Sequence, residues 1–152
     1  MSLWYRVFGT TDAPPDPDAL LRTLRETAPD VSLQFELGER GWLRAAVRLP
    51  RADAPLYLDR FWRDEEGIRA ELQAWAAWLE TCDDNPHSGP LMQHMTSTQQ
   101  VFTLRRPADA AALDAVCTAV CRFLAQATTG VYQVDGQGFF DADGNLLIPS
   151  ED

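Results

Sequence analysis

Apolar and polar side chains alternate along residues 31–49, and this period of two constrains the fold more than any other feature of the chain. The apolar positions that would share one face are Val31, Leu33, Phe35, Leu37, Leu43, Ala45, Val47 and Leu49. A two-residue loop would set Phe35 opposite Arg44 and mix core with solvent. A three-residue loop, 39–41, pairs Phe35 with Ala45 and has a glycine for the left-handed position of a bulge. We therefore predict an antiparallel hairpin with one buried face.

The other face of this hairpin carries the first candidate binding residues. With the three-residue loop, Leu37 pairs with Leu43, and Trp42 shares the outer face with Arg44 and Arg48. Either a second layer covers that face, or an aromatic and basic patch is exposed. An exposed tryptophan beside arginines is typical of a contact surface between proteins.

Other segments indicate further strands and three helices. The expected strands are 3–9, 55–62 and 98–106, and the expected helices are 16–28, 64–82 and 107–128. Asp16 is placed to cap the first helix, with Pro17 at its first position. Residues 83–97 are predicted to be the longest irregular stretch.

Residues 131–148 predict a three-stranded meander at the end of the chain. Asp135-Gly136 is a two-residue turn signal that pairs Tyr132 with Phe139. The run 141–145 is predicted to be the next turn.

The order of elements predicts an α+β fold in a single globular domain over 1–152. Strand–helix–strand–strand–(strand) occurs once before the central helix and once after it. We expect an antiparallel sheet, in two strand–helix–strand–strand halves, with about three helices packed on it. This layout resembles the gyrase-inhibitor-like ligand-binding fold, which joins two such units. The resemblance is one of architecture, because no residue motif of that family is matched.

Composition and charge exclude several classes of partner. The chain has 13 basic residues, all arginine and scattered, against 23 acidic residues, for a net charge of −10. Such a field repels nucleic acid and anionic lipid. No apolar stretch approaches the roughly 20 residues that a membrane-spanning helix needs. We see no secretory signal, and three cysteines without framework spacing favour a reducing compartment, so we expect a cytoplasmic protein.

The run DADGN resembles the middle of a calcium-binding loop. With Gly144 at the sixth position of an EF-hand, Asp141 and Asp143 occupy the third and fifth. Phe139 and Ser150 then fall where the first ligand and the bidentate Glu should be. We interpret the run as a turn and predict no metal there.

The cysteines and histidines are a second candidate site. Cys117 and Cys121 lie four residues apart, and with Cys82, His87 and His94 they would supply zinc ligands. The spacing is one residue too long for a zinc knuckle, and Cys in an alanine-rich helix is typically a buried apolar residue. Cys121, with His94 as its base, is a candidate nucleophile, but its helical position predicts a buried thiol, and a buried thiol is inert. We predict neither a metal nor a catalytic residue.

The sequence therefore favours a non-catalytic, cytoplasmic binding protein, an acidic partner-binding protein with the composition of antitoxin-like immunity proteins. The candidate binding residues are Trp42, Arg44, Arg48 and His94, and no cofactor is expected. One alternative is a small-molecule sensor, with the ligand in a cleft between the sheet halves near His94. The other is an enzyme with unrecognised residues. The partner is thus a protein or a small molecule, and the oligomeric state is left open.

Overall fold

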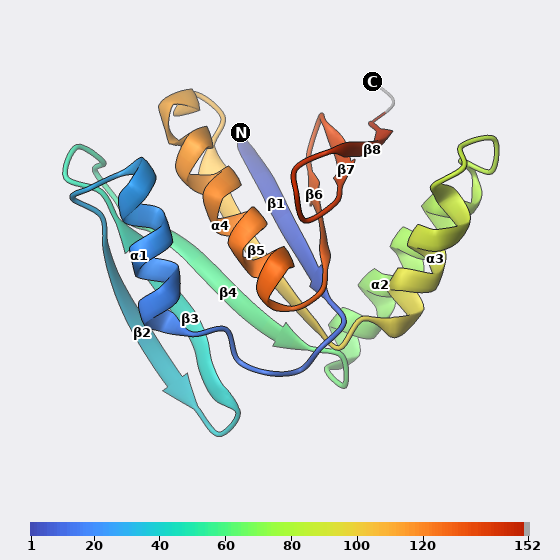
Figure 1. Cartoon of the computed structure of the whole chain (residues 1–152), viewed down its shortest axis with the longest axis horizontal. Helices are drawn as coiled ribbons and strands as arrows, with labels where there is room; N and C mark the ends of the chain where they lie inside the picture. Colours follow the sequence, from blue (N-terminus) through green and yellow to red (C-terminus); the bar gives the residue numbers. More distant parts are fainter. Residues whose placement is uncertain (151–152) are drawn as a thin grey trace.

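The computed structural model describes residues 1–150, which form an antiparallel sheet with helices on both faces (Figure 1). The strands are β1 (Ser2–Gly9), β2 (Ser32–Gly38), β3 (Gly41–Arg48), β4 (Leu56–Trp62), β5 (Gln100–Pro107), β6 (Val131–Val134), β7 (Gly138–Phe140) and β8 (Leu146–Pro149). The helices are α1 (Pro17–Thr27), α2 (Glu66–Glu80), α3 (Ser88–Ser97) and α4 (Asp114–Ala127), with the 3₁₀ turn η1 (Ala111–Leu113) before α4. The predicted α+β class is confirmed, with four α-helices in the described residues where about three were expected.

The strands lie in the order β2-β3-β4-β5-β1-β6-β7-β8. β1 and β5 pair with each other near the centre of the sheet, and each begins a run of strand, helix and three further strands. After α1 the chain crosses to the far edge, and β2-β3-β4 returns to β5. After α4 the chain enters beside β1, and β6-β7-β8 runs outward. The two predicted halves are present as runs of elements, but they occupy the sheet in opposite directions.

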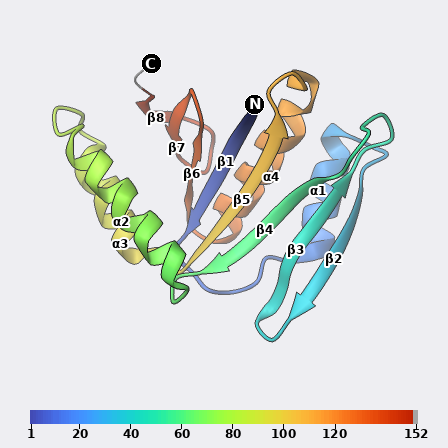
Figure 2. The ribbon, with the colours of Figure 1, turned by 180° about the vertical axis from the view of Figure 1, so that it is seen from behind.

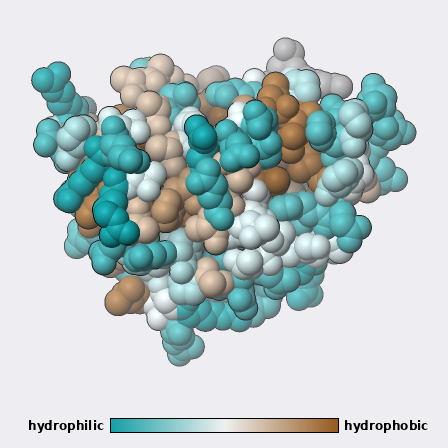
Figure 3. Space-filling view, in the orientation of Figure 1, coloured by the Kyte–Doolittle hydropathy of each residue, from teal (hydrophilic) through white to brown (hydrophobic). Residues whose placement is uncertain are grey.

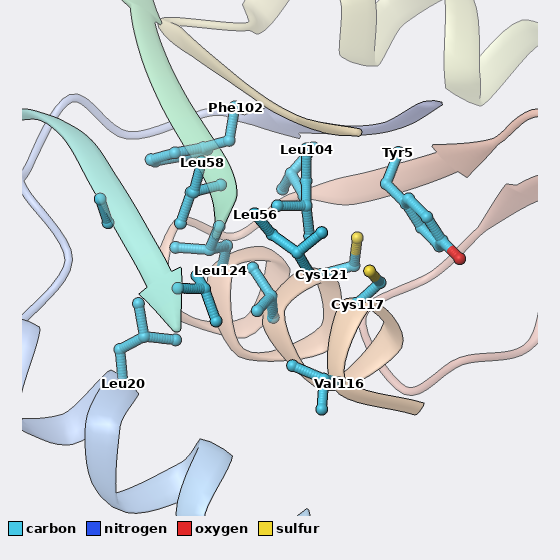
Figure 4. Packing of buried hydrophobic residues seen from close by; sticks show 14 of the residues in the cluster. Tyr5, Leu20, Leu56, Leu58, Phe102, Leu104, Val116, Cys117, Cys121 and Leu124 are labelled. Carbon is cyan, nitrogen blue, oxygen red and sulfur yellow. The ribbon is translucent and has the colours of Figure 1, made fainter. Parts of the chain in front are cut away.

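Two apolar cores hold the layers together. The larger core lies between the sheet and the pair α1 and α4, and includes Phe102 and Leu124, both fully buried (Figure 4). The smaller core lies between the sheet and the pair α2 and α3, around Phe8, Met95 and Phe139. Burial of a large apolar side chain stabilises the folded state by about 1.5–3 kcal/mol, so both helix pairs are fixed by the side chains they cover.

The hairpin of β2 and β3 differs from the prediction at its turn. Phe35 pairs with Ala45 as predicted. The loop has two residues, 39–40, and Leu43 is the extra residue of a bulge. Trp42 therefore takes the core-facing position predicted for Leu43, and its ring is 2% exposed. Because the bulge inserts one residue, the apolar side chains of β3 still face the core although the turn has only two residues. Burial of the large indole ring favours this arrangement.

The C-terminal meander is present, but its first turn is one residue longer than predicted. Tyr132 pairs with Phe140 instead of Phe139, because a three-residue loop begins at Asp135. Phe139 faces the smaller core, whereas Phe140 stacks on Tyr132 with 5.0 Å between ring centres. The Asp135 carboxylate accepts a hydrogen bond from Arg6 at 2.8 Å, and this contact holds the longer loop against β1.

The prediction that residues 83–97 are irregular is wrong, because α3 begins at Ser88. Pro90 is the third residue of this helix, where its missing N–H removes no intrahelical hydrogen bond. Leu91 and Met95 lie one turn apart and are both buried. Tertiary packing of this apolar pair therefore stabilises a helix of weak intrinsic propensity.

Outside the cores, the surface is mostly polar. Figure 3 shows an apolar area in the region of β7 and β8, where Leu146 is 51% exposed. Within residues 1–150, no helix combines the length and apolar character needed to cross a bilayer.

Candidate functional site

Part of the sheet face that carries α2 and α3 is not covered by these helices. In Figure 2 the ribbons of β3 and β4 stand in front of α1, α4 lies behind β5, and the α2–α3 pair lies to one side. One row of outward side chains across the sheet is Glu36, Arg44, Asp59, Thr103, Arg6 and Gln133. We call the part of this face formed by Trp4, Arg44, Tyr57, Asp59 and Arg105 the open face.

Arginines on the open face differ in their partners. Arg44 Nε donates to Asp59 Oδ1 at 2.6 Å, and the same guanidinium lies 4.7 Å from the centre of the Tyr57 ring. The hydrogen bond to Asp59 raises the pKa of Arg44. Arg105 lies 5.3 Å from the centre of the Trp4 ring, and no ion pair joins it to a carboxylate of residues 1–150. Arg105 is exposed, and within residues 1–150 its contact is with an aromatic ring and not with a carboxylate.

A groove of about 1360 Å³ continues from the open face over one end of the sheet. Its walls come from the segments 27–30, 49–55 and 107–113, and Trp4 and Tyr57 line it on the open face. Enclosed small-molecule pockets are typically about 300–1,000 Å³. The groove is larger than such an enclosed pocket and is bordered by three loops.

A second pocket, of about 370 Å³, lies where α2 meets β6 and β7. Trp75 and Trp78 of α2 line it, with ring centres 6.1 Å apart and ring planes at 83°. Phe139 lies 5.4 Å from the first ring and 5.9 Å from the second. Gln133 and Asp135 supply polar atoms. We call this site the indole pocket.

Arg6 joins the indole pocket to the open face. Its guanidinium donates to Gln133 Oε1 and to Asp135 Oδ1, each at 2.8 Å, and its Nε lies 3.2 Å from Glu71 Oε1. The guanidinium carbon is 5.4 Å from the centre of the Trp75 ring. Two carboxylates around one guanidinium give this cluster a net charge of −1.

The structure separates the residues predicted to bind a partner. Trp42 was expected beside Arg44, and this placement is wrong. Its Nε1 donates to the Pro15 carbonyl at 2.9 Å within the larger core, because the bulge at Leu43 turns the ring inward. Arg44 and Arg48 do lie on outward positions of β3, and Arg48 is exposed.

His94 lies on α3, away from those arginines. Its Nε2 donates to the carbonyl oxygen of Phe8 at 2.9 Å. Burial lowers the pKa of His94, and the hydrogen bond to Phe8 opposes that shift. The imidazole is thus held as a neutral donor between helix and sheet.

Trp4, Tyr57 and Arg105 were not singled out from the sequence. The available signal is the alternation in the segments 3–9 and 98–106, which sets Trp4 and Arg105 on the face opposite the larger core. Two such rows side by side would have indicated an amphipathic outer face.

The cysteines of α4 are buried as predicted. Cys117 is 0% exposed and Cys121 is 1% exposed, and both thiols lie among core side chains (Figure 4). Burial raises the pKa of Cys117 to about 12 and raises that of Cys121 well above its usual value. Cys121 lies in the larger core, whereas His94 belongs to α3 on the opposite face of the sheet, so they do not form a nucleophile–base pair.

The run DADGN forms the predicted turn. Asp141 Oδ1 accepts hydrogen bonds from the backbone N–H groups of Asp143 and Asn145, each at 2.9 Å. Gly144 has a φ of 89° and supplies the left-handed residue. Within the part of the chain that the structure describes, no group of three or more His, Cys, Asp or Glu side chains is placed to hold a metal ion.

Comparison with known proteins returned no match to a family model, a curated protein or a solved structure.

Proposed function

We propose that this chain is a non-catalytic, cytoplasmic binding protein whose open face receives a protein partner of net positive charge. The observation that carries the proposal is the open face itself. Helices pack on the other sheet face and on the β1, β6 and β7 side of this one, and α2 and α3 also reach Phe61 at the end of β4. The outward residues Arg44, Tyr57 and Asp59 lie on the part of β3 and β4 that has no helix over it (Figure 2). Aromatic and arginine side chains gather there.

The residue types on the open face suit a protein contact. Trp4 and Tyr57 are partly exposed, and Tyr57 retains 45% of its surface. Tryptophan, tyrosine and arginine are the residues most enriched at the energetic centres of protein interfaces. Arg105 stands over Trp4, so a carboxylate of the partner would meet an oriented guanidinium.

The net charge of the chain favours a partner of opposite net charge. A net charge of −10 attracts a basic protein and accelerates its association. The partner that we propose therefore has net positive charge and places one acidic side chain opposite Arg105. One feature supports a binding role over thiol catalysis: burial raises the pKa of Cys117 and Cys121, so both thiols are protonated at neutral pH. The cysteines are unpaired, which supports the cytoplasm.

The test isolates a partner and then removes the proposed contact. The chain is immobilised, a lysate of its host is passed over it, and the retained protein is identified, purified and titrated by calorimetry. Arg105→Glu should weaken binding by about 30-fold. This corresponds to a loss of about 2 kcal/mol in binding free energy, which is typical of a residue at the energetic centre of an interface. Arg25→Glu, the same charge change at an exposed position of α1, is the matched control and should bind like the wild type.

Binding should also weaken as salt rises, through a slower association rate. An isolated partner that binds Arg105→Glu and the wild type equally would refute the use of the open face. A partner of net negative charge would refute the electrostatic argument.

A further inference from the structure

Two aromatic side chains of one helix line the indole pocket. Trp75 and Trp78 lie on one face of α2, three residues apart, and their ring planes are nearly perpendicular, at 83°. The faces of indole rings carry negative electrostatic potential and attract ammonium and guanidinium groups. The volume of about 370 Å³ falls within the usual range of small-ligand pockets, about 300–1,000 Å³.

Charge around the pocket has the matching sign. Asp135 lines it, and Glu71 lies one helical turn before Trp75 on α2. Arg6 neutralises one of these two carboxylates, and one negative charge remains. Both carboxylates are only partly exposed, at 35% for Asp135 and 32% for Glu71, so their field is less screened than that of a fully solvated pair.

The chain already holds a cation beside this pocket. The guanidinium of Arg6 lies 5.4 Å from the Trp75 ring centre while bound to both carboxylates. Arg6 reaches this position from β1 and is not among the residues that line the pocket. The space beside Trp78 is therefore left for a second, external cation.

We propose that the indole pocket binds an organic cation, a quaternary ammonium or guanidinium group, carried by a small molecule or by a basic side chain of a protein. This proposal does not depend on the open face, because the indole pocket is formed by other residues and its test needs no protein partner. Its recognition elements are the ring faces of Trp75 and Trp78 and the excess carboxylate charge of Asp135 and Glu71.

The first test compares cations with neutral molecules of the same shape. Choline and 3,3-dimethyl-1-butanol, and N-acetyl-arginine amide and N-acetyl-citrulline amide, are titrated while the indole N–H resonances are followed by NMR. Each cation should shift the resonances of Trp75 and Trp78 and bind about tenfold more tightly than its neutral counterpart, a difference of about 1.4 kcal/mol. Tighter binding of choline would assign the site to quaternary ammonium ligands, and tighter binding of the arginine derivative to basic side chains.

The second test uses variants. Trp78→Leu should abolish the choline-induced shifts, whereas Trp62→Leu, at a tryptophan that lies against Arg40 and Arg60 instead, should leave them unchanged. Because loss of Trp78 affects the smaller core, Glu71→Gln is the second variant. It removes the net negative charge without changing side-chain size and should weaken choline binding several-fold.

Three results would overturn the proposal. They are the absence of shifts up to 100 mM choline, equal binding of choline and its neutral counterpart, and unchanged binding by Glu71→Gln.

Discussion

Replacing Tyr5 by Phe tests the buried polar cluster at the start of α4. Tyr5 is 1% exposed, and its hydroxyl donates to Asp114 Oδ1 at 2.5 Å while it accepts from Arg106 Nε at 2.8 Å. Burial and the hydrogen bond to Asp114 raise the pKa of Tyr5, so the hydroxyl stays protonated at neutral pH. The oxygen thus connects a carboxylate and a guanidinium that lie 3.8 Å apart.

The magnitude follows from what each group loses. Phe keeps the ring and its apolar contacts but removes both hydrogen bonds. Asp114, with 43% of its side chain exposed, can replace the bond with water, whereas Arg106 is 7% exposed and cannot do so at Nε. A buried donor without a partner costs about 1–3 kcal/mol. We expect a loss of about 2 kcal/mol in the free energy of unfolding, or roughly 4–8 °C in Tm for a chain of this size.

The assay is urea unfolding of the wild type, Tyr5→Phe and the matched control Tyr132→Phe. Tyr132 is 2% exposed and stacks on Phe140, but its hydroxyl does not connect two charged groups. Its replacement should cost under about 1 kcal/mol. Equal m-values are needed for the comparison. If both variants lose the same stability, the cluster around Tyr5 contributes no more than an ordinary buried hydroxyl, and the reasoning fails.

Two further predictions concern the backbone and pH. Gly41 has a φ of 96°, so Gly41→Val should reduce the unfolding free energy by about 1 kcal/mol or more, and Gly41→Asn by less; equal losses in urea unfolding would contradict the left-handed requirement. Burial holds the pKa of His94 below its usual 6.5, so its stabilising contribution is complete above that pH and is lost as the pH falls through the folded-state pKa. His94→Gln should show a shallower fall in stability below pH 6.5 than the wild type, and an identical pH profile would be evidence against the buried neutral imidazole.

Periodic patterns predicted the elements well, because they depend only on neighbouring residues. The N-terminal cap of α1 is an example: Asp16 accepts from the backbone N–H of Asp18 at 3.1 Å, and Pro17 is the first helical residue. The bulge at Leu43 was missed because a two-residue turn with an inserted residue and a three-residue turn both pair Phe35 with Ala45. Only the burial of an indole ring distinguishes them, and that depends on what covers the sheet.

Neither pocket could be predicted from local periodic patterns in the sequence. The indole pocket needs Trp75 and Trp78 to meet Asp135 in the β6–β7 loop and Phe139 in β7, both of which lie much later in the chain. No local spacing in the sequence indicates that these residues are in contact. The groove likewise combines three loops that only the sheet order brings to one end. The alternation in the sequence placed Arg44 and Arg48 on outward positions of β3, but it did not predict the open face to which Arg44 belongs.

The central position of β1 has a consequence for how the molecule is made. Ser2 pairs with Pro107 on one side of β1, and Tyr5 pairs with Val134 on the other. Such distant partners give the fold a high contact order, and closing loops of this length slows folding. The hairpins of β2, β3 and β4 need only local contacts and can form while the chain is still on the ribosome. β1 precedes β5 and β6 in the chain and gains both neighbours only after β6 has emerged, and until then at least one of its edges has no strand partner, which favours aggregation.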